Sequence, residues 1–166
     1  MRKLFIIALL SPFFSNAQVL RTEAIFPFLD IRPVLDLSVV PKGNALFFEP
    51  KKDRDFLTGM SQKNAFSVEI KSNTNWQLTI NSDAETFTNQ ATSMPSEISS
   101  EIIQIRQDKK TQYVALNTTP QVLAIGGPGG SKSKENNFDL DLALLPGDYM
   151  ESGGFQITLF FTLSSQ

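Results

Sequence analysis

The chain has 166 residues, and neither cysteine nor histidine occurs among them. Without these residues it can form no disulfide, no Ser-His-Asp or Cys-His catalytic centre and no zinc site of the ordinary kind. A hydrolase that works with two carboxylates remains chemically possible, but the acidic residues show no spacing that marks a catalytic pair. We therefore predict that the protein is not an enzyme and that it needs no cofactor.

A metal site is the next feature for which the sequence offers little. Asp139 and Asp141 fall on the same face of an expected strand, and Asp148 follows a turn. Their oxygens are of the kind that calcium prefers, but the spacing of a calcium-binding loop is missing. Outward aspartates beside an apolar core face are usually solvated, so we predict no metal ion.

Long apolar runs are also missing, except at the N-terminus. Arg2 and Lys3 precede an apolar stretch from Leu4 to Leu10, and small residues follow up to Ala17. This is the pattern of a secretory signal peptide, whereas Pro12 makes a membrane-spanning helix improbable on length. We predict a signal peptide over residues 1–17 and a secreted protein of the periplasm, cell surface or extracellular space.

The rest of the chain lacks a basic patch. Loss of Arg2 and Lys3 changes the formal net charge from −2 to −4, and the remaining lysines are scattered. We therefore expect no nucleic-acid partner and no membrane span after signal cleavage. Stability has to come from packing, for which 14 phenylalanines in the full sequence supply much of the apolar surface.

Apolar residues alternate with polar ones in several short segments, whereas no segment keeps a helical period over more than three turns. Such alternation is typical of half-buried β-strands. The expected strands include 34–40, 45–48, 64–71, 76–80, 137–145 and 155–163. We predict an all-β protein, either an antiparallel β-sandwich or a closed β-barrel. The proline-rich segment before residue 34 and a polar loop over 81–96 favour the sandwich.

Two connections were assigned from their turn residues. The runs 64–71 and 76–80 are joined by the short polar segment 72–75, which predicts a β-hairpin. The glycines of 126–130 lack the lysine and hydroxyl spacing of a phosphate-binding loop, and a strand follows them. We expect a hairpin loop there.

Three phenylalanines are candidates for a contact surface. In the last strand Phe155, Ile157, Leu159, Phe161 and Leu163 share one face, and Phe160 breaks the polar pattern of the other. Phe47 and Phe48 are adjacent, so one of them must point away from the core if their segment is a strand. Trp76 keeps step with Leu78 and Ile80 and is predicted to lie in the core.

The order of these segments resembles small secreted bacterial surface domains of fimbrial or adhesin type. The resemblance rests on 55–59, on the strand 66–70 followed by 72–80, on 114–120 and on a glycine, an aromatic residue and a Thr-rich alternating strand at the end. It implies an immunoglobulin-like β-sandwich that serves in surface fibres, in adhesion or in cell-envelope assemblies. Phe155 stands where a tyrosine is common in such domains.

Together these observations predict an extended arm over residues 18–33 and a single sandwich domain over 34–166. The expected function is that of an exported structural or adhesion subunit whose partners are other protein subunits or a surface glycan. If it forms homo-oligomers by strand addition, 18–40 is the expected donor. The alternative is a soluble periplasmic or extracellular module that binds a glycan or a protein.

Overall fold

The computed structural model describes residues 28–44, 46–145 and 152–166. The chain divides into two units, Met1–Ile31 and Arg32–Gln166. The predicted signal peptide and the arm up to residue 27 lie outside the described residues. The second unit contains every helix and strand that the structure describes.

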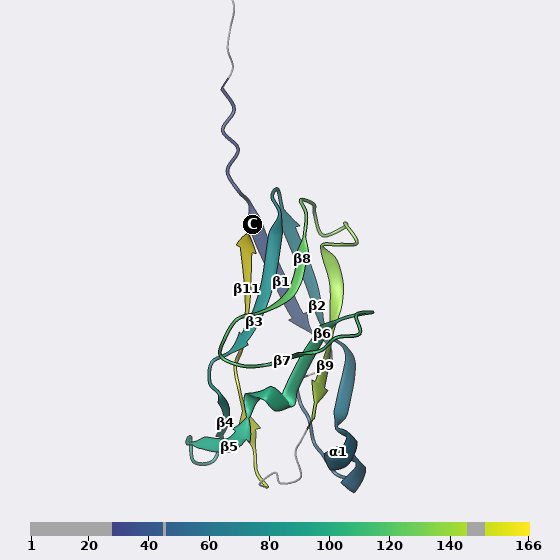
Figure 1. The fold of residues 1–166 in the computed structure, drawn as a ribbon, viewed down its shortest axis with the longest axis vertical. Coiled ribbons are helices and arrows are strands. Elements are labelled where there is room, and N and C mark those ends of the chain that lie inside the picture. Colours follow the sequence, from purple (N-terminus) through teal and green to yellow (C-terminus); the bar gives the residue numbers. More distant parts are fainter. Residues whose placement is uncertain (1–27, 45, 146–151) are drawn as a thin grey trace, which may run out of the picture. The chain divides into compact units, whose positions relative to one another are not determined.

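The second unit consists of short strands and very little helix, as the alternation predicted (Figure 1). Its elements are β1 (Leu35–Pro41), α1 (Asp53–Thr58), β2 (Met60–Ser72), β3 (Trp76–Ser82), β4 (Thr86–Asn89), β5 (Pro95–Ser99), the 3-10 helix η1 (Ser100–Ile102), β6 (Ile103–Gln107), β7 (Val114–Ala115), β8 (Gln121–Gly126), β9 (Asn137–Leu144), β10 (Phe155–Gln156) and β11 (Leu159–Ser165). No helix of the described residues is long and apolar enough to cross a membrane.

The strands form three antiparallel sheets. The largest has the order β1-β2-β9-β6-β7, and the two smaller ones have the orders β11-β3-β8 and β10-β4-β5. None of them closes on itself within the described residues. The predicted all-β sandwich is confirmed, and the closed barrel that we kept as an alternative is not the fold observed.

One apolar core lies between the five-stranded sheet and the β11-β3-β8 sheet. Inward residues of both sheets belong to the same buried cluster, with Val68 and Ile70 on β2 facing Leu78 and Ile80 on β3. Two pairs of aromatic rings also cross between the layers. The ring centroids of Phe66 and Phe161 lie 5.6 Å apart edge-on, and those of Trp76 and Phe138 lie 6.4 Å apart in a stack. Trp76 is fully buried, as predicted.

The predicted hairpin between 64–71 and 76–80 is wrong. Both segments are strands, but β2 pairs with β1 and β9, whereas β3 pairs with β11 and β8. The intervening turn carries the chain from one sheet to the other. Its Asn73 is bonded to the segment before β1: the side-chain Nδ2 donates to Arg32 O (2.8 Å), and Oδ1 accepts from Val34 N (2.7 Å). These bonds fix a corner between layers rather than a tight hairpin.

Two further loop assignments also change. The polar segment 81–96, expected to be a loop, contains β4 and the start of β5, which pair with each other. Its Phe87 packs against the core, as its isolated apolar character suggested. The glycine-rich segment after β8 is not a hairpin loop, since β8 and β9 belong to different sheets.

The final strand is interrupted. Residues Phe155–Gln156 form β10 beside β4, and only Leu159–Ser165 continue as β11 beside β3. At the break, the backbone N–H of Thr158 donates to Asp83 Oδ1 (3.0 Å), so a side chain takes the place of a strand neighbour. Phe160 points outward from β11, as predicted, and is 49% exposed.

The helix α1 begins beside a carboxylate that accepts two backbone hydrogen bonds. Asp55 Oδ2 accepts from the N–H groups of Lys51 and Lys52, each at 3.0 Å. These bonds favour the charged form of the Asp55 carboxyl and so lower its pKa below the ordinary value; the bond from Lys51 has the largest effect. The bonds satisfy N–H groups that no helical carbonyl reaches.

Candidate functional site

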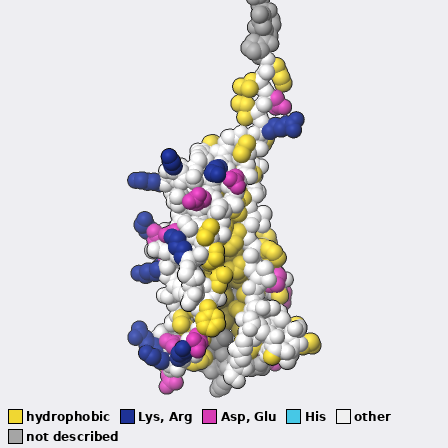
Figure 2. All heavy atoms as spheres, turned by 180° about the vertical axis from the view of Figure 1, so that it is seen from behind, with side chains coloured by type: hydrophobic (Ala, Val, Ile, Leu, Met, Phe, Trp, Pro, Cys, Tyr) yellow, Lys and Arg dark blue, Asp and Glu magenta, His cyan; other side chains and the backbone are white. Residues whose placement is uncertain are grey.

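The most distinctive surface of the described residues is an apolar cleft between β1 and β11, called the edge cleft below. Among the strands that the structure describes, each of these two pairs on one side only, β1 with β2 and β11 with β3. Their inward residues are half-buried, unlike those of the central strands, and they still pack against the core. These residues are Leu37, Val39, Leu159, Phe161 and Leu163. Figure 2 shows the resulting seam of apolar side chains between the two sheets.

The same residues turn backbone groups toward the open edge. The N–H of Lys42 donates to Ala65 O (2.8 Å), and the N–H of Asn73 donates to Val34 O (3.3 Å). The direction of the backbone N–H and C=O groups alternates along a strand. Those of the even-numbered residues of β1 therefore point toward β2, and those of Leu35, Leu37 and Val39 point toward the open edge.

On β11 the argument is the same. The N–H of Gln166 donates to Asn75 O (3.0 Å), and the N–H of Asp83 donates to Thr158 O (3.1 Å). The backbone groups of the even-numbered residues therefore point toward β3, and those of Leu159, Phe161 and Leu163 point toward the open edge. A polypeptide entering the edge cleft meets backbone donors, backbone acceptors and apolar side chains on both walls.

The cleft widens into a cavity at one end. β1 and β11 contact each other without pairing, and Figure 1 shows them side by side near the start of β1 and diverging toward its end. Beyond the divergence lies a cavity of about 340 Å³. Its walls come from the segment after β1, from β4, β5 and η1, from the segment that contains β10 and leads into β11, and from the start of β6 and the end of β9. The lining residues are Leu46, Phe47, Phe48, Phe87, Gln90, Ile98, Ile102, Ile103, Leu142, Leu144, Gly154, Phe155, Gln156, Ile157 and Leu159.

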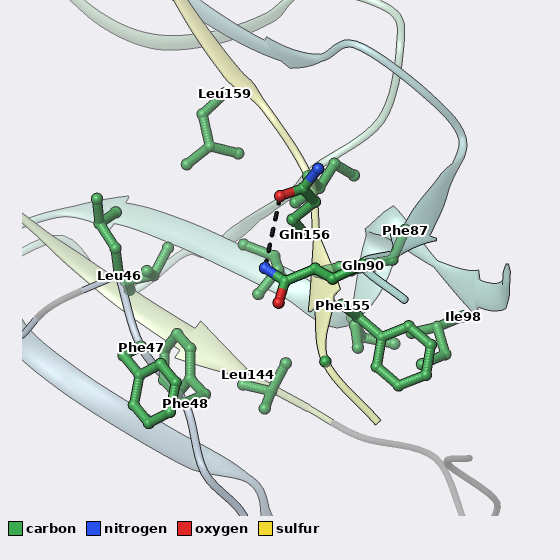
Figure 3. A pocket seen from close by; sticks show the side chains of 15 residues that line it. Leu46, Phe47, Phe48, Phe87, Gln90, Ile98, Leu144, Phe155, Gln156 and Leu159 are labelled. Atoms are coloured by element: carbon green, nitrogen blue, oxygen red, sulfur yellow. Dashed lines mark hydrogen bonds between the residues drawn. The ribbon is translucent and has the colours of Figure 1, made fainter. Parts of the chain in front are cut away.

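The cavity has an apolar lining and two carboxamides beside it (Figure 3). Gln90 Nε2 donates to Gln156 Oε1 at 3.4 Å. A β-carbon at Gly154 would lie 2.7 Å from Gln90 Oε1, so glycine allows the chain to pass close to this pair. Apolar walls with two carboxamides among the lining residues suit an apolar side chain whose backbone stays near water.

The structure brings two of the three predicted contact residues together. Phe47 and Phe48 both line the cavity; Phe47 is 65% exposed and Phe48 is half-buried against the core. They lie on no strand, although a strand was expected over 45–48, of which residue 45 is outside the described part. Phe160 points away from the cavity, on the outer face of β11. Sequence reasoning missed the Gln90–Gln156 pair, for which polar loop residues gave no signal.

The buried charge of the domain lies outside the cleft and has a structural role. Asp141 Oδ2 accepts from Arg106 Nε (3.0 Å) and Nη2 (2.9 Å), and Asp141 Oδ1 accepts from the backbone N–H of Asn64 (2.9 Å). The Arg106 guanidinium also lies 4.5 Å from the ring centre of Tyr113. Asp141 was expected to be a solvated outward residue, but this shell covers it and leaves the residue 3% exposed.

The aspartates weighed as calcium ligands are engaged otherwise. Asp139 binds Lys42 Nζ at 2.7 Å, Asp141 binds Arg106, and Asp148 lies outside the described residues. Within the described ranges no three acidic, histidine or cysteine side chains gather as metal ligands would. The edge cleft is therefore the feature from which a function has to be argued. No protein-family model matches the chain, and no curated protein matches it either.

Proposed function

We propose that the chain is an exported structural or adhesion subunit of a bacterial surface assembly, and that its edge cleft receives an extended apolar segment of a partner subunit. The observation that carries the proposal is the coincidence, on β1 and β11, of edge-facing backbone groups with half-buried inward side chains. Exposed strand edges are ready templates for pairing with another chain. An inserted strand would complete both the hydrogen bonding and the core.

The energetics favour an apolar occupant. A backbone hydrogen bond contributes about 0.5–1.5 kcal/mol net, and each apolar Å² removed from water adds about 25 cal/mol. Five half-buried side chains line the cleft, and the cavity at its wide end offers room for a large one. A peptide with apolar residues at alternate positions would satisfy both contributions at once.

The segment that precedes β1 supplies a donor of this kind in a second copy of the chain. The expected donor, 18–40, has to be shortened, because Leu35–Pro41 pairs with β2 along its whole length. The shortened donor is 18–31, because Asn73 also holds Arg32 and Val34 within their own subunit. Apolar residues are dense in it, and Phe28, Leu29 and Ile31 are exposed. Its Pro27 is compatible with an edge or inserted strand but not with a helix interior.

The donor side is tested by deleting residues 18–30. We expect the purified protein to change from a mixture that contains oligomers to a monomer, because the inserted strand is lost. Light scattering after size-exclusion chromatography measures the molar mass. A full-length chain with Phe28→Ser and Leu29→Ser controls for length and should also lose oligomers. An unchanged distribution of masses in the deletion variant would contradict the proposal.

The acceptor side has a matched pair of variants on one strand. Val39 points into the edge cleft, whereas its neighbour Val40 points outward and is exposed. We expect Val39→Asp to weaken assembly at least tenfold, since a charge would be buried beneath the inserted strand, and Val40→Asp to leave it unchanged. Assembly is measured by mixing each variant with the parent chain, which supplies the arm, and following the molar mass. Equal effects of the two variants would count against the cleft.

A glycan-binding module is the second candidate. The observation that favours it is the pairing of Phe47 and Phe155 walls with the carboxamides Gln90 and Gln156 near the cavity. Sugars stack on exposed aromatic rings and bond to such amides. A glycan array followed by Phe47→Ala distinguishes the candidates, with Phe160→Ala, outside the cavity, as the control. Absence of binding at millimolar glycan excludes this candidate.

A further inference from the structure

The outer face of the β11-β3-β8 sheet is uncharged. None of the residues of β3, β8 and β11 is acidic or basic. The inward residues of β3 are buried, so its outward positions are Gln77, Thr79 and Asn81. The register places Phe160, Thr162 and Ser164 of β11 on one side of them, and Val122 and Ile125 of β8 on the other. We call this surface the neutral face.

The opposite layer of the sandwich, in contrast, has charged residues on its outer face. The outer face of the five-stranded sheet carries the ion pairs Lys71–Asp36 (3.1 Å), Lys42–Asp139 (2.7 Å) and Arg106–Asp141 (2.9 Å). Figure 2 shows this contrast across the apolar seam, with charged side chains gathered on one side and few on the other. The neutral face is thus a local property of three strands and does not follow from a chain poor in charge.

Apolar side chains stand out from the neutral face along both of its edges. Phe160 on β11 is 49% exposed, and on β8 Val122 and Ile125 are 51% and 64% exposed. A register shift between Leu78 and Thr79 places Val122 opposite Thr79 and turns it outward. Natural sheets usually protect such surfaces with lysine or other charges. Their absence here indicates a surface that is covered in the assembled protein.

We propose that the neutral face is a lateral contact between two copies of this chain. A two-fold contact brings the same patch of both copies together, so charges near the axis would meet their own copies and repel, and an uncharged patch avoids this repulsion. A two-fold axis parallel to β3 lays β11 of each copy over β8 of the other. Phe160 then lies over the Val122 end of the facing β8, and the threonine and amide side chains of the central strand meet one another.

The size of the neutral face sets the strength of the contact. Three strands of six or seven residues cover about 14 Å by about 24 Å, which is less than the roughly 800 Å² per partner of a stable complex. A single pair is therefore weak. Repetition along an assembly raises the effective concentration of each further contact, and this part of the inference rests on the proposed function.

The test places a charge on the neutral face where the proposed contact would bury it. We expect Thr162→Lys to raise the dissociation constant of self-association at least tenfold, because the new lysine would lie against Val122 of the facing β8 without a partner charge. Ser38→Lys is the matched control: it is exposed on β1, on the outer face of the charged sheet, and should have no effect. Sedimentation equilibrium up to millimolar concentration measures both. Phe160→Ser, with thermal unfolding as a check on folding, should weaken the contact as well.

The deletion of residues 18–30 separates this inference from the proposed function. Self-association that persists after the deletion and is lost with Thr162→Lys supports the lateral contact, whatever the deletion does to larger oligomers. Self-association that disappears with the deletion alone overturns it, as does an equal effect of Thr162→Lys and Ser38→Lys. Binding of a glycan by a monomer that never self-associates also overturns it.

Discussion

Replacing Arg106 by alanine is expected to lower the free energy of unfolding by about 3 kcal/mol. The substitution leaves the Asp141 carboxylate, whose side chain is 4% exposed, without the guanidinium that donates two hydrogen bonds to its Oδ2. Breaking a buried ion pair from one side typically costs about 3–5 kcal/mol. The lower figure applies because the Arg106 side chain is itself 24% exposed, so water can enter the space it leaves. Denaturation in urea, followed by tryptophan fluorescence, measures the change.

The control for this prediction is the exposed pair on the same sheet. Lys71 and Asp36 are 3.1 Å apart with side chains 60% and 61% exposed, so Lys71→Ala should change stability by no more than about 1 kcal/mol. If Arg106→Ala costs as little as Lys71→Ala, the interaction with Asp141 is no more than a surface ion pair. The bond from Asn64 would then be sufficient to hold Asp141.

Replacing Gly126 by alanine is expected to lower the free energy of unfolding by about 3 kcal/mol, the upper end of the usual cost of overpacking. An added β-carbon would lie 2.6 Å from Cε2 of the fully buried Trp76 ring and closer still to Cζ2. The ring cannot yield, because its Nε1 donates to Gly127 O (3.0 Å) and it stacks on Phe138. The midpoint of thermal unfolding should fall. The wavelength of tryptophan emission from the native state should also shift.

Gly130→Ala, in the loop that follows β8, is the matched control. A β-carbon there meets no atom within 4 Å, so stability should stay within about 0.5 kcal/mol of the parent. Equal losses at the two glycines would mean that this segment as a whole, rather than contact with Trp76, requires glycine.

Period-two alternation predicted the positions of the long strands, but not which strands are neighbours. The runs 64–71 and 76–80 became β2 and β3, with the expected residues inward. Alternation fixes the buried side of a strand and is identical for two strands in one sheet and two strands in facing sheets. The difference depends on Asn73, whose side chain bonds to Arg32 and Val34 far along the chain.

The candidate site was predictable only in part, for a related reason. Leu163 and Leu78 occur in the same kind of alternating run, yet Leu78 is fully buried and Leu163 is half-buried. That difference follows from whether another strand lies alongside, which a local pattern does not encode. Phe47 and Phe48 attracted attention as adjacent aromatic residues, and the cavity they share with Phe155 exists only because the sheets diverge there.

The divergence of β1 and β11 has a consequence for any polymer of this chain. The edge cleft is wide at the cavity and narrow where the two strands touch, so the proposed insertion would favour one direction of the inserted segment. Subunits joined in this way all point the same way, and the two tips of the filament differ chemically: one carries a vacant cleft and the other an unused arm. A subunit without an arm could then only terminate growth at one tip, which makes the arm a determinant of filament length.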